Sequence, residues 1–282
     1  MKYIGINKDQ IVVSVSLVCF GITIQILLSV FSSKLSELDV TLARWAKSHS
    51  ATSSFPFDTG LIHFLNHLPY VACIISGCLL LIPVLFNSLV LKFKFKQLKS
   101  LYMYYFWSLL AYMCLVYSIL LIIKFSVNRP RPFQTLEFHP DFDTDLSCKL
   151  EYMSIYRPYK GPNPCSYRLS SCPSGHSLTI SAFYLSVTYL SFYNYKFCKR
   201  NSTKRVIHWF HLIFCTFMVT ITGVFIGAVM IGRISVLKHF FTDVVAGTGL
   251  SVLMLFVFVL FEHKTEDNWS RLVVEEQIYT SQ

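Results

Sequence analysis

A histidine and an aspartate with a spacing suited to chemistry stand beside a long apolar run near the end of the chain. In "GRISVLKHFFTD", His239 precedes Asp243 by four positions. On a helix this spacing places both side chains on one face, so the carboxylate can orient one imidazole nitrogen while the other attacks. Ionisable groups are costly at the edge of hydrocarbon and mark a functional site by default. We therefore interpret His239 as a nucleophile and Asp243 as its partner.

A second stretch, "SSCPSGHS", opens another apolar run with the groups expected of an anion site. Gly175 lets the backbone approach a ligand closely, and the N–H groups at the start of a helix favour negative charge. Ser174 adds a hydroxyl, and His176 adds a proton donor. Taken alone, "PSGH" is a short motif, and His176 is also compatible with a simple role in capping a helix.

Three cations complete the set: Lys124 and Arg131 in "KFSVNRPRP", and Arg233 shortly before His239. Lysine and arginine at helix ends often snorkel without any further role. Guanidinium forks, however, match the oxygens of a phosphate group. A nucleophile, an acid and several cations from three separate stretches together resemble an oxyanion-stabilising phosphate pocket. The pattern predicts phosphoryl chemistry.

The composition indicates an integral membrane protein. Of the 282 residues, 54% are hydrophobic and only 14% are charged, which is too apolar for an ordinary soluble domain. The net charge of +10 does not indicate a nucleic-acid partner, because the basic residues lie in short clusters between apolar runs and no nucleic-acid motif accompanies them. Anionic lipid surfaces and anionic substrates fit this charge better.

Six apolar runs are long enough to cross a bilayer, which needs about 20 residues. They cover residues 11–31, 69–91, 104–127, 174–195, 207–231 and 240–261. The first is interpreted as a retained helix, since no small-residue cleavage pattern follows it. The segment 33–68 is too polar to span and is expected to lie along the interface as an amphipathic helix and turn. The predicted fold is an all-α polytopic membrane protein with one domain, residues 1–282, and a motif-bearing core at 104–262.

The basic residues of short loops set the expected orientation. Loops 92–103 and 196–206 are rich in lysine and arginine and are expected in the cytoplasm, together with both termini. Segments 33–68, 128–173 and 232–239 then share the outer face. The long outer-face loop 128–173 is also basic, against the orientation rule, so some of its cations are expected to be used. The aromatic residues of this loop are compatible with a lid over the site or with recognition of a lipid headgroup, and equally with ordinary surface packing.

The nine cysteines suggest no metal site. Six of them lie in or beside apolar runs and are interpreted as small hydrophobic residues. Cys148, Cys165 and Cys172 share the polar loop, which allows one disulfide if that loop faces an oxidising compartment. Which two would pair is left open.

The three stretches are similar to the signature of the type 2 phosphatidic acid phosphatase superfamily, which reads K-x6-RP, PSGH and SR-x5-H-x3-D. The matching positions are Lys124 with Arg131 and Pro132, then Pro173 to His176, then Arg233 with His239 and Asp243. The chain departs from the signature at Gly232, where the family has serine. Six helices with an outward-facing site resemble the integral-membrane branch of the family.

The resemblance implies that His239 attacks phosphorus to form a phosphohistidine, that Asp243 holds its imidazole, and that His176 protonates the leaving oxygen before water completes hydrolysis. The spacing of the signature selects Arg131 rather than Arg129. The role of Arg129 is left open, and guiding the substrate or contacting lipid is the role considered for it and for Lys238. No cofactor and no metal are expected, because Asp243 lacks neighbouring carboxylates with which to build an oxygen cage. The groups that would hold the phosphoryl oxygens are Lys124, Arg131, Ser174, Gly175 and Arg233.

The resemblance also implies a phosphorylated membrane lipid as the substrate. The ending "KHFFTDVVAG" is similar to bacterial members that act on lipid A phosphates, isoprenyl pyrophosphates or phosphatidylglycerol phosphate; lipid A phosphate ranks first, and phosphatidate stays open. The expected location is a bacterial inner membrane, with the site facing the periplasm. A lipid phosphotransferase with the same intermediate is an alternative. A transporter is disfavoured, because the ionisable residues crowd at one end of the spans. The oligomeric state is left open.

Overall fold

The computed structural model of the chain is built from helices. It describes residues 8–48, 82, 95–138, 150–153, 169–201 and 205–280. In these ranges the only β-type pairing is a single isolated bridge between Thr135 and Leu150. The all-α prediction is therefore confirmed for the described part of the chain. In chain order its elements are α1 (Lys8–Val30), α2 (Ser32–Ser48), α4 (Phe95–Val127), the 3-10 helix η1 (Pro132–Gln134), α5 (Gly175–Asn201), α6 (Arg205–Ser235) and α7 (Phe241–Thr280).

Four helices in the described ranges contain a segment that is long and apolar enough to cross a membrane. These segments are Val12–Val30, Tyr105–Gln134, His208–Ser235 and Phe241–Leu260. They match the predicted runs 11–31, 104–127, 207–231 and 240–261, so the chain is a multi-pass membrane protein. The predicted run 69–91 lies outside the described residues except for residue 82, and the count of six spans remains a prediction.

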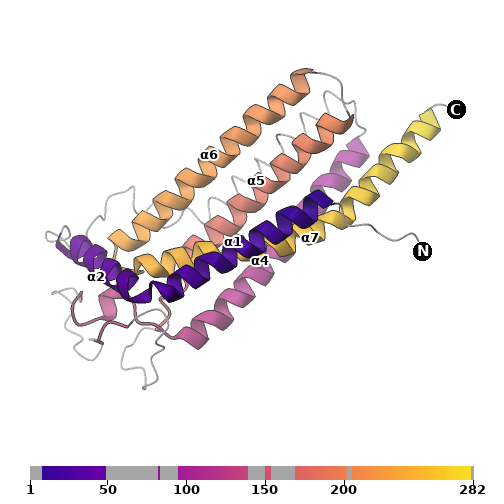
Figure 1. The fold of residues 1–282 in the computed structure, drawn as a ribbon. Helices are drawn as coiled ribbons and strands as arrows, with labels where there is room; N and C mark the ends of the chain where they lie inside the picture. The colour runs from indigo at the N-terminus through magenta and orange to yellow at the C-terminus, as the bar shows by residue number, and fades with distance from the viewer. Residues whose placement is uncertain are drawn as a thin grey trace.

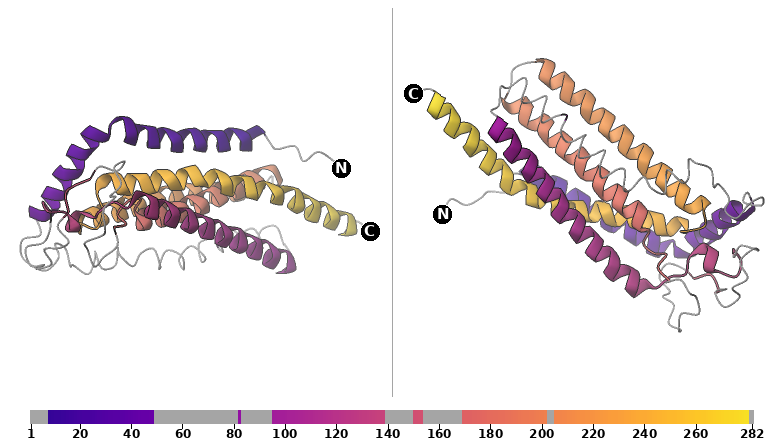
Figure 2. Two further views of the ribbon diagram at one scale, coloured as in Figure 1. Left: turned by 90° about the horizontal axis from the view of Figure 1, so that it is seen from below. Right: turned by 180° about the vertical axis from the view of Figure 1, so that it is seen from behind.

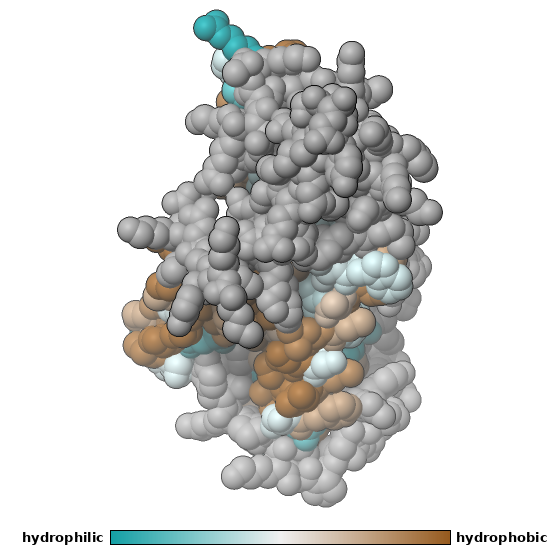
Figure 3. All heavy atoms as spheres, turned by 90° about the vertical axis from the view of Figure 1, so that its right-hand side faces the viewer, coloured by the Kyte–Doolittle hydropathy of each residue, from teal (hydrophilic) through white to brown (hydrophobic). Residues whose placement is uncertain are grey.

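Large apolar side chains on the outer flanks of these helices are not covered by the rest of the protein. Exposed examples are Phe20 on α1, Trp107 and Ile122 on α4, and Trp209 and Ile213 on α6. Apolar residues, drawn in brown, also stand out on the described flanks visible in Figure 3. An extended apolar surface of this kind suits contact with lipid hydrocarbon rather than water.

The predicted run 174–195 forms α5, which is more polar than the four apolar segments. Its serines are buried, because α5 contacts α4, α6 and α7 (Figure 1). Ser186 and Ser191 donate their hydroxyls within the helix, to the carbonyls of Ala182 and Val187 one turn earlier. A helix enclosed by protein does not need the apolarity of a helix that faces lipid, so α5 tolerates these hydroxyls.

The chain bends between α1 and α2, so that α2 lies across one end of the bundle (Figure 2). Helical hydrogen bonding continues through the bend, where the Leu35 amide donates to the Phe31 carbonyl at 2.8 Å. The buried residues of α2 are Asp39, Ala43 and Ala46, which recur at intervals of four and three and so form one narrow face. The amphipathic helix predicted within 33–68 is confirmed as far as residue 48; residues 49–68 lie outside the described ranges.

The helix ends that carry the three motifs meet at the end of the bundle occupied by α2 (Figure 1). α4 ends there, α5 begins there, and α6 turns there into α7. The beginnings of α1 and α4 and the last turns of α7 lie at the opposite end (Figure 1). The fold thus collects the predicted chemical groups at one end of a membrane bundle.

Candidate active site

Two left-handed residues turn the chain back toward the bundle where α4 and α6 end. Asn128 follows α4 with φ 47°, and its amide donates to the Lys124 carbonyl at 3.1 Å. Leu237 follows α6 with φ 55°, a conformation that costs a non-glycine residue on the order of 1 kcal/mol. The amide of His239 donates to the Arg233 carbonyl at 3.3 Å. The second turn thereby places His239 in a bend just before α7.

His239 does not share a helix with Asp243, because α7 begins only at Phe241. The predicted common helix face is therefore wrong. The ring atom Nδ1 lies 2.8 Å from the carbonyl oxygen of Ser171 and 3.9 Å from Oδ2 of Asp243. Since a carbonyl oxygen only accepts, the bond to Ser171 requires the proton on Nδ1 and leaves the lone pair on Nε2. The backbone of Ser171 orients the ring, and Asp243 lies within reach of its charge.

The environment of His239 keeps its imidazole neutral. The side chain is 2% exposed, and burial lowers its pKa well below the usual 6.5. The positive charges of Arg233, Lys124 and Arg131, and the nearby His176, lower this pKa further. These four residues come from α4, the segment after α4, α5 and α6. The predicted motifs are therefore brought together around one imidazole.

Asp243 is fully buried in the first turn of α7, and both of its oxygens accept hydrogen bonds. Oδ1 accepts from Arg129 at 2.6 Å, while Oδ2 accepts from the hydroxyl of Ser171 and from the amide of Phe240, the latter at 2.9 Å. The bond to Phe240 closes the N-terminus of α7 as in a capping box. Ser171 thus connects the two residues, with its hydroxyl on Asp243 and its carbonyl on His239.

Arg129 lies in the middle of this polar cluster and has no exposed surface. All five guanidinium N–H groups have acceptors, and the group also lies 4.5 Å from the ring centroid of Phe240. The expectation that Arg129 guides substrate or contacts lipid is wrong, because such a residue would have to reach the surface. Its acceptors are Met153 O (2.8 Å) for Nε, Thr242 Oγ1 (2.8 Å) and Asp243 Oδ1 (2.6 Å) for Nη1, and Asp39 Oδ2 (3.0 Å) and Tyr152 Oη (3.2 Å) for Nη2.

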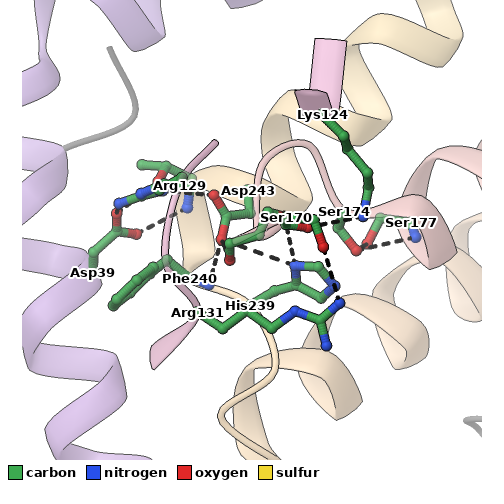
Figure 4. Close-up of polar contacts among 12 residues, drawn as sticks. Asp39, Lys124, Arg129, Arg131, Ser170, Ser174, Ser177, His239, Phe240 and Asp243 are labelled. Carbon is green, nitrogen blue, oxygen red and sulfur yellow. Dashed lines mark hydrogen bonds and ion pairs between the residues drawn. The ribbon is translucent and has the colours of Figure 1, made fainter. Parts of the chain in front are cut away.

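Asp39 reaches the same cluster from α2 (Figure 4). Its Oδ1 accepts the amide of Thr242 at 2.9 Å, and its Oδ2 accepts the hydroxyl of Thr242 at 2.6 Å. Burial raises the pKa of Asp39, and the positive charge of Arg129 opposes that rise. The argument that Asp243 has no neighbouring carboxylate is therefore wrong. A second carboxylate is present, and the guanidinium of Arg129 lies between the two.

Two of the predicted phosphate-binding cations converge on Ser170 (Figure 4). Lys124 Nζ donates to its carbonyl at 2.9 Å, and Arg131 Nη2 donates to its hydroxyl at 3.3 Å. The Nε of Arg131 is buried and has no hydrogen-bond partner in the described part of the chain. Arg233 is 8% exposed in the last turn of α6. Several positive charges thus lie close to His239, which suits the binding of an anion.

The start of α5 is tightly packed against α7. The amide of Ser174 donates to the carbonyl of Asp243 at 2.9 Å, and the hydroxyl of Ser174 accepts from the amide of Ser177 at 3.4 Å as an N-cap. A Cβ at Gly247 would lie 2.7 Å from the Ser174 carbonyl oxygen, so only glycine allows this approach. A Cβ at Gly175 would lie 3.8 Å from Nζ of Lys124. The "PSGH" stretch therefore adjoins the lysine as predicted, although the Ser174 amide is already used.

Sequence reasoning missed Ser171, Thr242 and Asp39. Ser171 belongs to the quoted "SSCPSGHS" stretch, but its decisive group is a backbone carbonyl, which no residue type reveals. Asp39 did leave a signal: it falls on the same face of its amphipathic helix as Ala43 and Ala46. A carboxylate in an otherwise small and apolar stripe requires a buried partner.

The structure also shows where other residues named in the sequence predictions lie: Lys238, some of the loop aromatics and one of the loop cysteines. Lys238 Nζ lies 4.6 Å from the ring centroid of Phe133. Phe138 and Tyr152 pack against Phe240, and the hydroxyl of Tyr152 also contacts Arg129 and Asp39. The loop aromatics Phe142, Tyr156, Tyr159 and Tyr167 lie outside the described residues. Cys172 is a buried free thiol, which excludes it from the suggested disulfide, and Cys148 and Cys165 also lie outside the described residues.

Comparison with known proteins identifies the family. A family model described as the PAP2 superfamily matches residues 105–267, more than half of the chain. No curated protein sequence gives a significant match. Among solved structures, one match is described as the first transmembrane PAP2-type phosphatidylglycerolphosphate phosphatase, from Bacillus subtilis. It has 17% sequence identity and a TM-score of 0.46, with 87% of this chain and 96% of that chain covered. The chain therefore belongs to the PAP2 superfamily of phosphatases, as a member that crosses the membrane several times.

Proposed function

We propose that the chain is a lipid phosphate phosphatase that works through a phosphohistidine on His239. The observation that carries the proposal is the environment of that imidazole, which is buried, bonded through Nδ1 to Ser171 and close to three cations. A neutral imidazole keeps the Nε2 lone pair for attack, while Lys124, Arg131 and Arg233 attract and stabilise the phosphoryl group.

In the first step, Nε2 of His239 bonds to phosphorus while the bond between phosphorus and the lipid oxygen breaks. His176 donates a proton to the leaving oxygen, so the lipid departs as an alcohol, or as a lipid monophosphate if the substrate is a pyrophosphate. The imidazole ring gains a positive charge in this step. Asp243, 3.9 Å from Nδ1, stabilises that charge.

In the second step, a water molecule attacks the phosphohistidine. His176 takes the proton of that water, and the bond between phosphorus and Nε2 breaks. Inorganic phosphate leaves, and both histidines return to their starting states. All of these steps use protein groups and water, so we propose that no metal or cofactor is required.

The phosphoryl oxygens are proposed to lie among Lys124, Arg131 and Arg233 and the start of α5, where Gly175 and Ser174 border the lysine. Arg131 supports this placement, because its buried Nε retains an unused donor in the described part of the chain. A phosphoryl oxygen would satisfy that donor and add a charge-assisted hydrogen bond.

The substrate is proposed to be a membrane lipid, since the cluster lies where apolar helices end. Its chains would lie against the apolar flanks, with the phosphate at the surface. The beginning of α4, the end of α5 and the beginning of α6, where the sequence is basic, lie at the end opposite the cluster (Figure 1), which supports cytoplasmic termini and a periplasmic site in a bacterial inner membrane. Lipid A phosphate remains the favoured substrate, with isoprenyl pyrophosphate, phosphatidylglycerol phosphate and phosphatidate as alternatives.

The proposal is tested by phosphate release from purified protein in detergent or lipid, with a chelator present and these lipids as substrates. Release from at least one lipid phosphate, and its loss in His239→Ala at an unchanged Tm, is the expected result. Full activity of His239→Ala would contradict the mechanism. Transfer of labelled phosphate to a second lipid, without release, would instead identify a phosphotransferase.

A further inference from the structure

One charged residue of the polar cluster comes from outside the part of the chain that the PAP2 family model matches. Asp39 lies on α2, whereas the match begins at residue 105. Its side chain is 1% exposed, and no other charged residue of α2 is buried. α2 is also attached to the loop after η1, where Arg44 forms an ion pair with Glu137 and Lys47 donates to the Glu137 carbonyl at 3.4 Å. These contacts hold Asp39 at the cluster.

The hydrogen bonds of Asp39 fit an ionised carboxylate. Its two oxygens accept from four donors, which are the amide and hydroxyl of Thr242, the guanidinium of Arg129 and the hydroxyl of Tyr152. A charged carboxylate only accepts, so four donors directed at it match the anion. Thr242 is the second residue of α7, and negative charge is also favoured at a helix N-terminus.

The charges of the cluster do not cancel. Arg129 carries one positive charge, whereas Asp39 and Asp243 carry one negative charge each, so the three together carry a net negative charge. The guanidinium presents Nη1 to Asp243 and Nη2 to Asp39. If Asp39 were neutral, Arg129 and Asp243 would form a balanced pair, and less negative charge would remain next to His239.

Building on the phosphohistidine mechanism, we propose that Asp39 is a positioning residue that shares Arg129 with Asp243 and so keeps a net negative charge on this three-residue cluster beside His239. This charge favours the step in which the imidazole becomes positive. The hydrogen bonds described for Asp39 all lie within the Arg129 cluster. Removing its charge should therefore slow phosphorylation of His239 without weakening substrate binding.

The first test is Asp39→Asn, which has nearly the same shape and lacks the charge. We expect kcat to fall on the order of tenfold, with KM changed by less than about twofold. Glu37→Gln is the matched control, because it removes the same charge from the same helix at a side chain that is 72% exposed. The control should keep wild-type kcat and KM. A wild-type kcat in Asp39→Asn, or a change confined to KM, would overturn the inference.

A second variant separates charge from simple structural support. In Asp39→Asn combined with Arg129→Gln, the three-residue cluster again carries a net negative charge, which lies on Asp243. We expect kcat of the double variant to exceed that of Asp39→Asn, as long as Tm shows that both are folded. A purely structural role for Asp39 predicts that the second loss of hydrogen bonds lowers kcat further. That result would overturn the inference.

Two controls keep the outcome decisive. If Asp39→Asn does not fold, Asp39→Glu is used, and a fall in kcat of tenfold or more in the folded protein would contradict the importance of the charge. The wild-type chain and His239→Ala are measured alongside. Activity that is present in the wild type and absent in His239→Ala supports the phosphohistidine mechanism. An unchanged kcat in Asp39→Asn would then overturn the role of Asp39 and leave that mechanism standing. Equal activity of the wild type and His239→Ala overturns both.

Discussion

The carbonyl oxygen of Ser171 lies 2.8 Å from Nδ1 of His239, while the nearest oxygen of Asp243 lies 3.9 Å from the same nitrogen. The ring is thus oriented by a backbone group, and the carboxylate acts at longer range as a charge. Side-chain substitution cannot remove a carbonyl, so the orientation of His239 should survive changes at Asp243. The orienting effect of Ser171 and the charge effect of Asp243 can therefore be measured separately.

Asp243→Asn should therefore lower kcat without abolishing it. We expect a loss of about tenfold to a hundredfold, because the amide cannot stabilise the imidazolium but the Ser171 carbonyl still fixes the tautomer. His239→Ala should have no measurable activity. Steady-state kinetics on one lipid phosphate, with Tm recorded for each variant, tests this order. If folded Asp243→Asn were as inactive as folded His239→Ala, then Asp243 itself would have to orient the imidazole of His239.

The pH dependence of stability should reveal the neutral state of His239. Its folded pKa is well below 6.5, so in acid the unfolded chain binds a proton that the folded chain does not. The contribution of His239 to stability is thus fully present above pH 6.5 and is lost as the pH falls below it. We expect Tm of the wild type to fall more steeply than that of His239→Gln as the pH is lowered from 7 to 5. If Tm fell equally with pH in the wild type and in His239→Gln, the pKa of His239 in the folded protein would be ordinary.

Gly247→Ala should disturb the site from outside it. The new Cβ would lie 2.7 Å from the carbonyl oxygen of Ser174, and since that atom belongs to the backbone, α5 and α7 must shift apart. We expect a destabilisation of about 1–3 kcal/mol and a clear loss of activity. Gly227→Ala on α6 is the matched control, because its Cβ would meet nothing within 4 Å. Similar Tm and activity in the two variants would disprove the close contact.

The role of His176 can be examined through the leaving group. A general acid matters most when the leaving oxygen is basic, as in an alkyl phosphate, and least when it leaves readily, as in p-nitrophenyl phosphate. His176→Ala should therefore lose on the order of a hundredfold in kcat on the alkyl ester and much less on the aryl ester. Equal losses on both substrates would assign His176 to binding instead.

Residue type and spacing were enough to select the groups that meet in space. Lys124, Arg131, His176 and Arg233 were chosen from separate stretches, and all four lie close enough to His239 to influence its pKa. The prediction succeeded because two spans that follow each other in the chain have their adjoining ends at the same surface of the membrane, whatever the length of the loop between them.

The hydrogen-bond and ion-pair partners within the site could not be predicted in the same way. The helix-face argument failed at His239, because the chain reverses through Leu237 in a left-handed conformation that the sequence "SVLKHF" does not suggest. The buried role of Arg129 was not recognised because its partners Asp39 and Asp243 lie far from each other in the chain and meet only in the fold. α5 became a buried helix despite its serines because its neighbours, rather than lipid, surround it.

The central claim is that phosphorus becomes bonded to His239, and trapping that bond tests it most directly. Purified protein would be mixed with a phosphate-labelled lipid, quenched in alkali within the first turnover and digested for mass spectrometry. We predict an acid-labile, alkali-stable phosphoryl group on the peptide that contains His239, absent in His239→Ala and increased when turnover of the intermediate is slowed. Phosphate release at the normal rate with no label on His239 at any quench time, or label on another residue, would contradict the account.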